Sequence, residues 1–401
     1  MKILISIFFL VANRFFCMSQ SIQGVVVDSI SKEPIPYVHV YDTKFEIGTI
    51  TNKDGQFIFN KKKENQEITF SHIGYTRKKF LVKKNETSLL ISLAPKSELL
   101  SEVTIDDQGY KFAKMALIKL MNPNTASFGS AFYRQVTITG ETPSGFIETF
   151  NNISSNPSGL EKSAIYQARY ASAKSKVDIV HFSLSNFSYL TFGFKIFSTQ
   201  QSDIAKPFDP NYFDDFTYTI KSYFEDNGIK YATILYDMSP KINRPSMVGD
   251  FTINTNTGSL VNFSATIKHS LGADSLTVNQ PNQPLRRISL ANHTYHWVCG
   301  FSDSTIPTLD FINVSFSASF ILSNKPIAAS VSSHLIVFEK DTKGKKGLKN
   351  PEINQKDINQ IKKSKYNPGF WKNNPLIKRT HFEDEVISYF EKSNSFGTAV
   401  K

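Results

Sequence analysis

Several motifs that often identify an enzyme are missing from this sequence. None of its eight histidines begins a His-x-x-Glu or His-Glu-x-x-His motif, the spacings that hold zinc in peptidases. The nucleophile motif Gly-x-Ser-x-Gly and Gly-rich phosphate loops are absent too. We therefore predict that the chain is not an enzyme, and we assign no catalytic, cofactor-binding or metal-binding residue and no cofactor.

Cysteine is scarce as well. Cys17 lies in an N-terminal apolar stretch that we expect to be removed, which leaves Cys299 alone in the mature chain. A single cysteine cannot form an internal disulfide, so stability must come from buried apolar area. The 34 Phe, 16 Tyr and 2 Trp supply that area. Cys299 stands between Val298 and Gly300 in an apolar context, which favours an inert thiol.

Long apolar runs are confined to the N-terminus. Residues 1–19 have the pattern of an export signal, with Lys2 before an apolar core and a small-x-small site at Cys17-Met-Ser19. The run is too short for a membrane span, which needs about 20 apolar residues. The residues before Cys17 do not fit a lipoprotein signal, so we expect simple cleavage. The expected location is the periplasm, the outer-membrane periphery or the external medium.

The segment from Ile22 to Leu93 alternates apolar and polar residues between turn signals, as a small antiparallel β-sandwich does. Its recognisable pieces are Gly24-Val-Val-Val-Asp28, Pro34-Ile-Pro36, Gly48-Thr-Ile-Thr51, Asp54-Gly55-Gln-Phe57, Ser71-His-Ile-Gly74-Tyr75 and Leu90-Ile-Ser-Leu93. Their order resembles the carboxypeptidase regulatory-like domain, a transthyretin-type sandwich common in envelope proteins of Bacteroidota. The resemblance implies a binding or structural module without catalytic residues.

Two oxygen-bearing residues in this segment raise the question of a calcium site. Asn52 and Asp54 flank the Asp54-Gly55 turn. Calcium takes six to eight oxygen ligands, and two side chains cannot supply them. We therefore interpret Asn52 and Asp54 as turn residues.

The remainder predicts a second, larger β-region. Residues 96–122 form a linker and a helix, with helical spacing over Tyr110–Met121. Residues 123–401 then contain long alternating runs separated by hairpin turn sequences such as Asp226-Asn-Gly228. The predicted fold class is mainly β, with the transthyretin-like sandwich at 20–95 followed by a curved antiparallel β-sheet domain and a few helices.

The predicted final helix starts at Thr380-His-Phe-Glu383, a capping box, and ends near Gly397. We expect Phe382, Val386, Tyr389 and Phe390 to form its apolar stripe. Outside the sandwich, Ala131-Phe-Tyr-Arg134, Phe146-Ile-Glu148 and Tyr366-Asn-Pro-Gly-Phe-Trp371 resemble exported Bacteroidota proteins in which a β-rich domain follows the regulatory-like module. Most of those proteins have no assigned activity.

One His/Cys cluster and two acidic clusters are candidate chemical sites. In His293-Thr-Tyr-His296-Trp-Val-Cys299, a strand would place His296 on the face opposite His293 and Cys299, so we predict no metal site. Asp214-Asp215 precede a strand and fit a solvated turn. The acidic residues at 383–385 lie in a helix's first turn, where negative charge complements the dipole.

The formal charge of +11 gathers partly in residues 340–365, which hold nine lysines. No aromatic residue accompanies them before Tyr366, so we predict a solvated loop and no nucleic-acid partner. Peripheral contact with anionic lipid or polysaccharide is the next alternative.

The leading functional hypothesis is a non-catalytic exported cell-envelope protein with a binding or scaffold role, whose partner is an envelope protein or an apolar or polysaccharide ligand. One alternative is a carrier or sensor of lipid, with a Phe-rich concave sheet closed by the Phe382–Phe390 helix; Phe216 to Lys268 resembles the strands of lipoprotein-carrier half-barrels. Another alternative is a hydrolase acting on envelope peptide or glycan.

Overall fold

The computed structural model describes residues 21–42, 44–45, 47–96, 99–100, 107–122, 126–173, 188–199, 202–268, 275–278, 286–302, 307–322, 325–341, 344, 346–351, 361 and 366–396. The export signal, most of the linker, most of the lysine-rich stretch and Gly397 lie outside these residues. Among the described helices, none is both long and apolar enough to cross a membrane.

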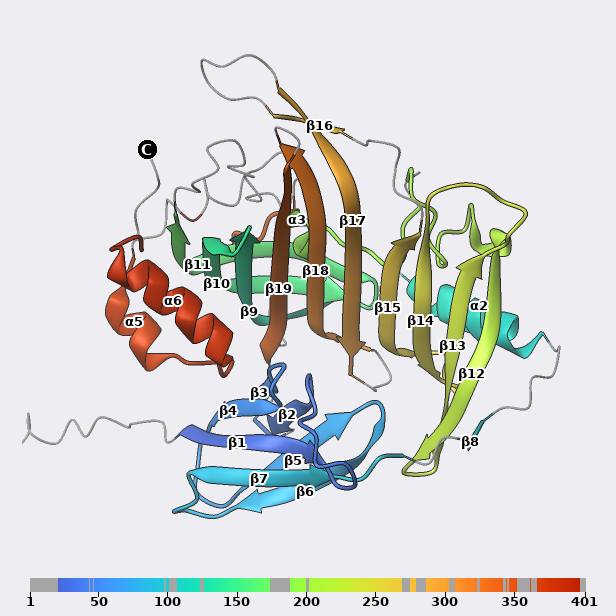
Figure 1. Ribbon diagram of the computed structural model, residues 1–401. Helices are drawn as coiled ribbons and strands as arrows, with labels where there is room; N and C mark the ends of the chain where they lie inside the picture. The colour runs from blue at the N-terminus through green and yellow to red at the C-terminus, as the bar shows by residue number, and fades with distance from the viewer. Residues whose placement is uncertain are drawn as a thin grey trace, which may run out of the picture.

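The N-terminal part is a sandwich of two sheets (Figure 1). In the first sheet β1 (Ser21–Asp28) pairs with β4 (Gln56–Asn60) and runs parallel to β7 (Ser88–Leu93). The second sheet contains β2 (His39–Asp42), β3 (Ile47–Ile50), β5 (Gln66–His72) and β6 (Tyr75–Val82). Alternate residues of both sheets, among them Ile22, Val26, Phe57, Phe70 and Ile91, form the core between them.

The geometry of the turn between β3 and β4 explains the residues that occupy it. Gly55 has φ +67°, a conformation that favours glycine, and a Cβ there would lie 2.7 Å from the carbonyl oxygen of Val26. Asn52 Oδ1 accepts hydrogen bonds from the backbone nitrogens of Asp54 and Gln56 at 3.0 and 2.9 Å. The interpretation of Asn52 as a turn residue is confirmed.

A large curved antiparallel sheet forms the rest of the protein, and the predicted fold class is confirmed. Its hydrogen-bonded strand order is β11-β10-β9-β19-β18-β17-β15-β14-β13-β12-β8, and β16 adds to β17. The strands are β8 (Leu99–Leu100), β9 (Ser127–Thr139), β10 (Thr142–Asn156), β11 (Gly159–Ser172), β12 (Phe216–Asp226), β13 (Ile229–Met238), β14 (Ser246–Asn254), β15 (Leu260–Lys268), β16 (Ser275–Val278), β17 (Arg286–Phe301), β18 (Leu309–Leu322) and β19 (Lys325–Asp341).

The concave face of this sheet is covered by other parts of the same chain. Helix α2 (Gln108–Leu120), close to the predicted range, packs against β12. Helix α3 (Tyr189–Phe192) and the stretch 194–216, which contains the 3₁₀ turn η2 (Phe213–Asp215), contribute further core residues. Apolar side chains of 194–199 and 202–216 therefore pack on the concave face.

The convex face of β9–β11 is covered by α5 (Pro368–Asn373) and α6 (His381–Lys392), which lie beside these strands in Figure 1. The predicted capping box is confirmed: Thr380 Oγ1 accepts from the Glu383 backbone nitrogen at 3.1 Å, and Glu383 Oε2 accepts from that of Thr380 at 2.8 Å. The helix packs on the large β-sheet, as expected, but on its convex face, whereas the alternative carrier hypothesis needed it over the concave face. Val386, Ile387 and Phe390 pack on Val136 and Phe146, which point away from the concave core.

The predicted apolar stripe also needs correction. Phe382 and Tyr389 are 50% and 39% exposed. The buried face consists of Glu383, Val386, Ile387 and Phe390, spaced i, i+3, i+4 and i+7. The stripe is rotated because Glu383 turns inward to meet Arg134, at 3.1 Å from its Nη1.

The sandwich and the large sheet are joined by hydrogen bonds and ion pairs. Strand β3 pairs with β19 at Ile47 and Glu339. His39 Nδ1 lies 3.3 Å from Asp310 Oδ2, and Lys340 Nζ lies 3.0 Å from Asp310 Oδ1. Lys340 is thus part of β19 and of this junction, and including it in a solvated loop was wrong.

Candidate functional site

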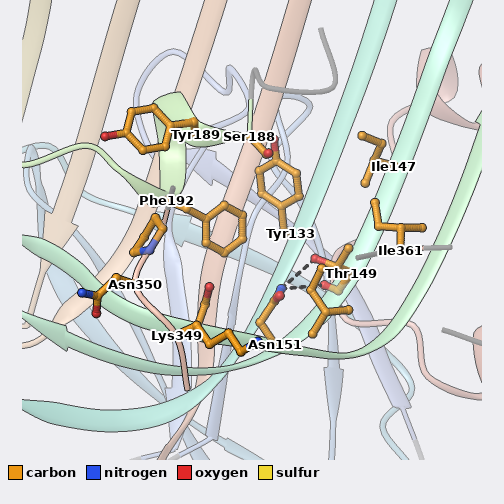
Figure 2. Close-up of a pocket in the computed structure, with 13 residues that line it drawn as sticks. Tyr133, Ile147, Thr149, Asn151, Ser188, Tyr189, Phe192, Lys349, Asn350 and Ile361 are labelled. Atoms are coloured by element: carbon orange, nitrogen blue, oxygen red, sulfur yellow. Dashed lines mark hydrogen bonds between the residues drawn. The ribbon is translucent and has the colours of Figure 1, made fainter. Parts of the chain in front are cut away.

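A pocket lies on the concave face, where β9–β11 meet α3 (Figure 2). Because side chains alternate along a strand, every second residue of β10 reaches it. The lining consists of Tyr133, Ile147, Thr149, Asn151, Ser163, Ile165, Ser188, Tyr189, Phe192, Lys349, Asn350, Pro351 and Ile361. Its floor is apolar, and hydroxyl and amide groups project from its walls.

The α3 side of the pocket is fixed by three contacts with the sheet. Thr191 Oγ1 and Ser333 Oγ are 3.0 Å apart in the buried interior. Trp297 Nε1 donates to the carbonyl oxygen of Leu190 at 3.0 Å. The rings of Phe192 and Tyr133 lie 5.1 Å apart between centroids. The pocket wall is therefore held in place from β19, β17 and β9.

Asn151 is the most informative polar residue of the pocket. Its side chain is fully buried, and its Nδ2 donates to Thr149 Oγ1 at 2.7 Å and to the Thr149 carbonyl at 3.4 Å (Figure 2). Its Oδ1 has no hydrogen-bond partner in the described part of the chain. A buried acceptor without a partner costs about 1–3 kcal/mol, and because this oxygen is itself buried, the donor of a ligand reaches it only if neighbouring side chains move.

The size of the pocket limits what it can enclose. The cavity measures about 60 Å³, whereas drug-sized ligands occupy pockets of roughly 300–1,000 Å³. Over the rest of the concave face, Phe194, Phe208 and Phe213 belong to the chain's own core. The predicted Phe-rich face is therefore present, but these aromatic side chains pack against protein within the described residues.

His293, His296 and Cys299, the cluster considered as a metal site, do not share one face of β17. Cys299 belongs to the concave core, and burial raises the pKa of its thiol far above the usual range. His296 lies on the other face, with its Nδ1 3.1 Å from Thr266 Oγ1. His293 is half-buried, and its ring lies 5.9 Å from that of Tyr295. The described residues contain no group of three His, Cys, Asp or Glu side chains that could hold a metal ion.

The predicted acidic clusters have structural partners. Tyr110 donates its hydroxyl to Asp214 Oδ1 at 2.7 Å, which connects α2 to η2. In α6, Asp384 pairs with Arg379 at 2.7 Å and Glu385 with His381 at 3.2 Å. Glu383 differs from both neighbours because it points into the protein.

A buried ionic row crosses the convex face of β9–β11. Arg134, Glu148 and Arg169 stand opposite one another in the strand register. Arg134 Nε donates to Glu148 Oε1 at 2.7 Å, and Glu148 also pairs with Arg169. The sequence did not predict this row, because a register shift between Pro143 and Gly145 brings Glu148 opposite Arg134, where equal spacing from the turn would have placed Ile147.

Glu383 completes the ionic row from α6. Burial alone would raise the pKa of Glu383, but the charge of Arg134 outweighs it and lowers the pKa below its ordinary value. Burial opposes the charge on Arg134, while Glu383 and Glu148 raise the pKa of that guanidinium. All four side chains are nearly inaccessible to solvent. The ionic row therefore has a structural role and holds α6 against the sheet.

Comparison with known proteins identifies the N-terminal part. Residues 22–105 match the family model described as the CarboxypepD_reg-like domain, so the resemblance predicted from the sequence is confirmed. No curated protein matches the chain.

A solved structure from Bacteroides fragilis, of a protein of unknown function described as membrane-associated, aligns over 80% of this chain and 98% of its own. The identity is 12% and the TM-score 0.15. A likeness at this level carries no functional argument.

Proposed function

We propose that this chain is an exported, non-catalytic binding protein of the cell envelope. Its regulatory-like sandwich would serve as a docking module, and the concave pocket would receive a small group of a ligand or partner. The match of residues 22–105 to the CarboxypepD_reg-like domain supports a non-catalytic module. The export signal expected at residues 1–19 supports the envelope location.

The observation that carries the proposal is the chemistry of the pocket. Its polar groups are hydroxyls, amides and the single cation Lys349, and no carboxylate, imidazole or thiol is among the described residues that line it. General acid–base catalysis uses His most often, whereas the titratable side chains of this lining are Lys349 and the tyrosines Tyr133 and Tyr189. The pocket instead offers Asn151 Oδ1 as an unpaired acceptor, which suits binding of a donor group.

The experiment is a native mass spectrum of the mature chain purified gently from its own envelope. We expect a stoichiometric added mass, from a small molecule or a companion protein, that Asn151→Leu removes. Asn262→Leu, a strand residue of β15 outside the pocket, is the matched control and should retain the mass.

Two results would overturn the proposal. One is a bare mass for the native protein in repeated gentle preparations. The other is turnover of envelope peptide or glycan by the purified chain, which would revive the hydrolase hypothesis. An added mass that extracts as lipid and survives Asn151→Leu would instead favour the carrier hypothesis.

A further inference from the structure

A second cavity, of about 220 Å³, lies at the junction between the sandwich and the large sheet. It is separate from the concave pocket, and the inference drawn from it goes beyond the function proposed above. We propose that this junction cavity binds one sugar ring of a neutral envelope glycan. Its lining consists of Ile47, Gly48, Thr49, Ile58, Phe59, Asn60, Lys62, Phe150, Tyr166, Phe338, Glu339, Phe370, Asn374 and Leu376.

One wall of the junction cavity is aromatic. Phe150 lies at its centre, with ring centroids 5.0 Å from Phe370, 5.9 Å from Phe338 and 6.0 Å from Tyr166. These rings come from β10, β11, β19 and α5, so the wall is assembled from segments far apart in sequence. Tyr166 is 42% exposed, an unusual state for an aromatic residue beside a buried cluster, and it offers its ring to an incoming ligand.

Polar side chains also line the cavity, among them Asn60 of the sandwich, Glu339 of β19 and Asn374 after α5. Asn60 Nδ2 donates to the Pro375 carbonyl at 3.4 Å, and Asn374 Nδ2 donates to the Phe370 carbonyl at 2.8 Å. These bonds fix the amides by their nitrogens and leave their carbonyl oxygens as acceptors for a ligand. Lys62, an exposed cation, adds donors to this lining.

A sugar ring matches a lining that combines aromatic rings with polar side chains. One face of a pyranose carries polarised C–H bonds that pack on the negative face of an aromatic ring, while its edge carries hydroxyls that donate and accept. A lipid chain would leave the amides without partners at a desolvation cost. A nucleic acid would require several phosphate-binding cations, whereas Lys62 is the one cationic side chain among the described lining residues.

Size and position support the same ligand class. A volume of about 220 Å³ lies below the roughly 300–1,000 Å³ of drug-sized sites, as expected for one ring of a longer chain. The cavity has openings to solvent through the exposed Tyr166 and Lys62, which would let the rest of a glycan continue outward.

The test measures oligosaccharide binding to the mature full-length chain by saturation-transfer NMR and titration calorimetry. The probes are cellotetraose, maltotetraose, mannotetraose and tetra-N-acetylchitotetraose, each at up to millimolar concentration. We expect at least one to bind, with about a tenfold loss of affinity in Tyr166→Ala because one stacking contact is removed. Tyr389→Ala, whose ring is 39% exposed on α6, is the matched control and should bind as the wild type does.

A third variant separates this inference from the proposed function. Ile165 precedes Tyr166 on β11 but lines the concave pocket, so Ile165→Ala should disturb the concave pocket and leave sugar binding intact. Absence of binding by all four probes would overturn the junction proposal alone, as would equal affinity in Tyr166→Ala. Binding of a tyrosine-containing peptide in place of the sugars would assign the cavity to a protein partner and also overturn it.

Discussion

The two faces of β10 carry opposite kinds of chemistry. Ile147, Thr149 and Asn151 face the concave pocket with apolar and neutral polar groups. Phe146, Glu148 and Phe150 alternate with them on the convex face and hold aromatic clusters and a buried charge. The convex face is locked by ion pairs to the C-terminal helix, whereas the concave face retains an acceptor for a ligand. One strand thus carries a charged face that holds the C-terminal helix and a neutral face that lines the concave pocket.

The largest effect should come from removing the central charge of the convex face. Glu148→Ala leaves Arg134 and Arg169 buried without their shared partner, and breaking such a pair costs about 3–5 kcal/mol. Urea unfolding should show a correspondingly lower free energy of unfolding. The control Glu385→Gln changes an exposed carboxylate on α6 and should change stability by less than about 0.5 kcal/mol. Equal free energies of unfolding for the two variants would contradict a stabilising role for the buried ionic row.

A somewhat smaller effect is expected from the buried stripe of α6. Phe390→Ala empties a fully buried position, and we expect a loss of about 3 kcal/mol. Phe382→Ala, at a half-exposed position of the same helix, should cost less than about 1 kcal/mol. Thermal and urea unfolding of the two variants measure the loss of unfolding free energy. A larger loss for Phe382→Ala than for Phe390→Ala would support the stripe predicted from the sequence.

Acid should weaken the convex side before the concave pocket. Burial lowers the pKa of His334, beside Glu383 and Arg134, to about 4, and that of His72 in the sandwich to about 4. Both stay neutral in the folded protein while the unfolded chain takes up protons near 6.5. Stability is therefore present above pH 6.5 and is lost progressively as the pH falls from 6.5 toward 4.

Urea unfolding at pH 7.5, 5.5 and 4.5 measures this loss, and His334→Asn should reduce it. Glu383 and Asp310 have lowered pKa values, so their contributions disappear at still lower pH. A stability independent of pH between 7 and 4.5 would contradict the assignment of neutral buried histidines.

The smallest effect should be found at the concave pocket. Asn151→Leu replaces a buried amide whose oxygen has no partner, so the free energy of unfolding should stay within about 1 kcal/mol of wild type or rise. A loss above about 2 kcal/mol would mean that Asn151 is structural, and would remove the basis for a binding role.

Local patterns predicted the sandwich and the course of most strands because short alternating runs and Gly-containing turns are encoded next to each other. The same patterns missed α5 and the packing of 194–216, since irregular segments are positioned by distant partners. The stripe of α6 was misplaced for the same reason. The sequence predicts Glu383 only as a capping-box carboxylate, because its buried partner Arg134 lies 249 positions earlier in the chain.

The concave pocket could not be predicted from the sequence for a related reason. Thr149 and Asn151 are ordinary strand residues, and only the closure of α3 over β9–β11 turns their face into a cavity. Pairing of Arg134 with Glu148 was hidden as well, because the register shift between Pro143 and Gly145 changes the partner that the turn alone would give.

The contacts that close the junction join the two extremes of the described chain. Thr49 Oγ1 donates to the carbonyl oxygen of Leu376, which follows it by 327 positions, and Asn52 Nδ2 donates to the carbonyl oxygen of Lys378. A chain exported from its N-terminus can form the sandwich early, but the junction must wait until these later residues emerge. A chain that ended before these residues would leave Ile50 and Phe150 without the covering side chains of Trp371 and Ile377, so the junction is the last part of the molecule to form.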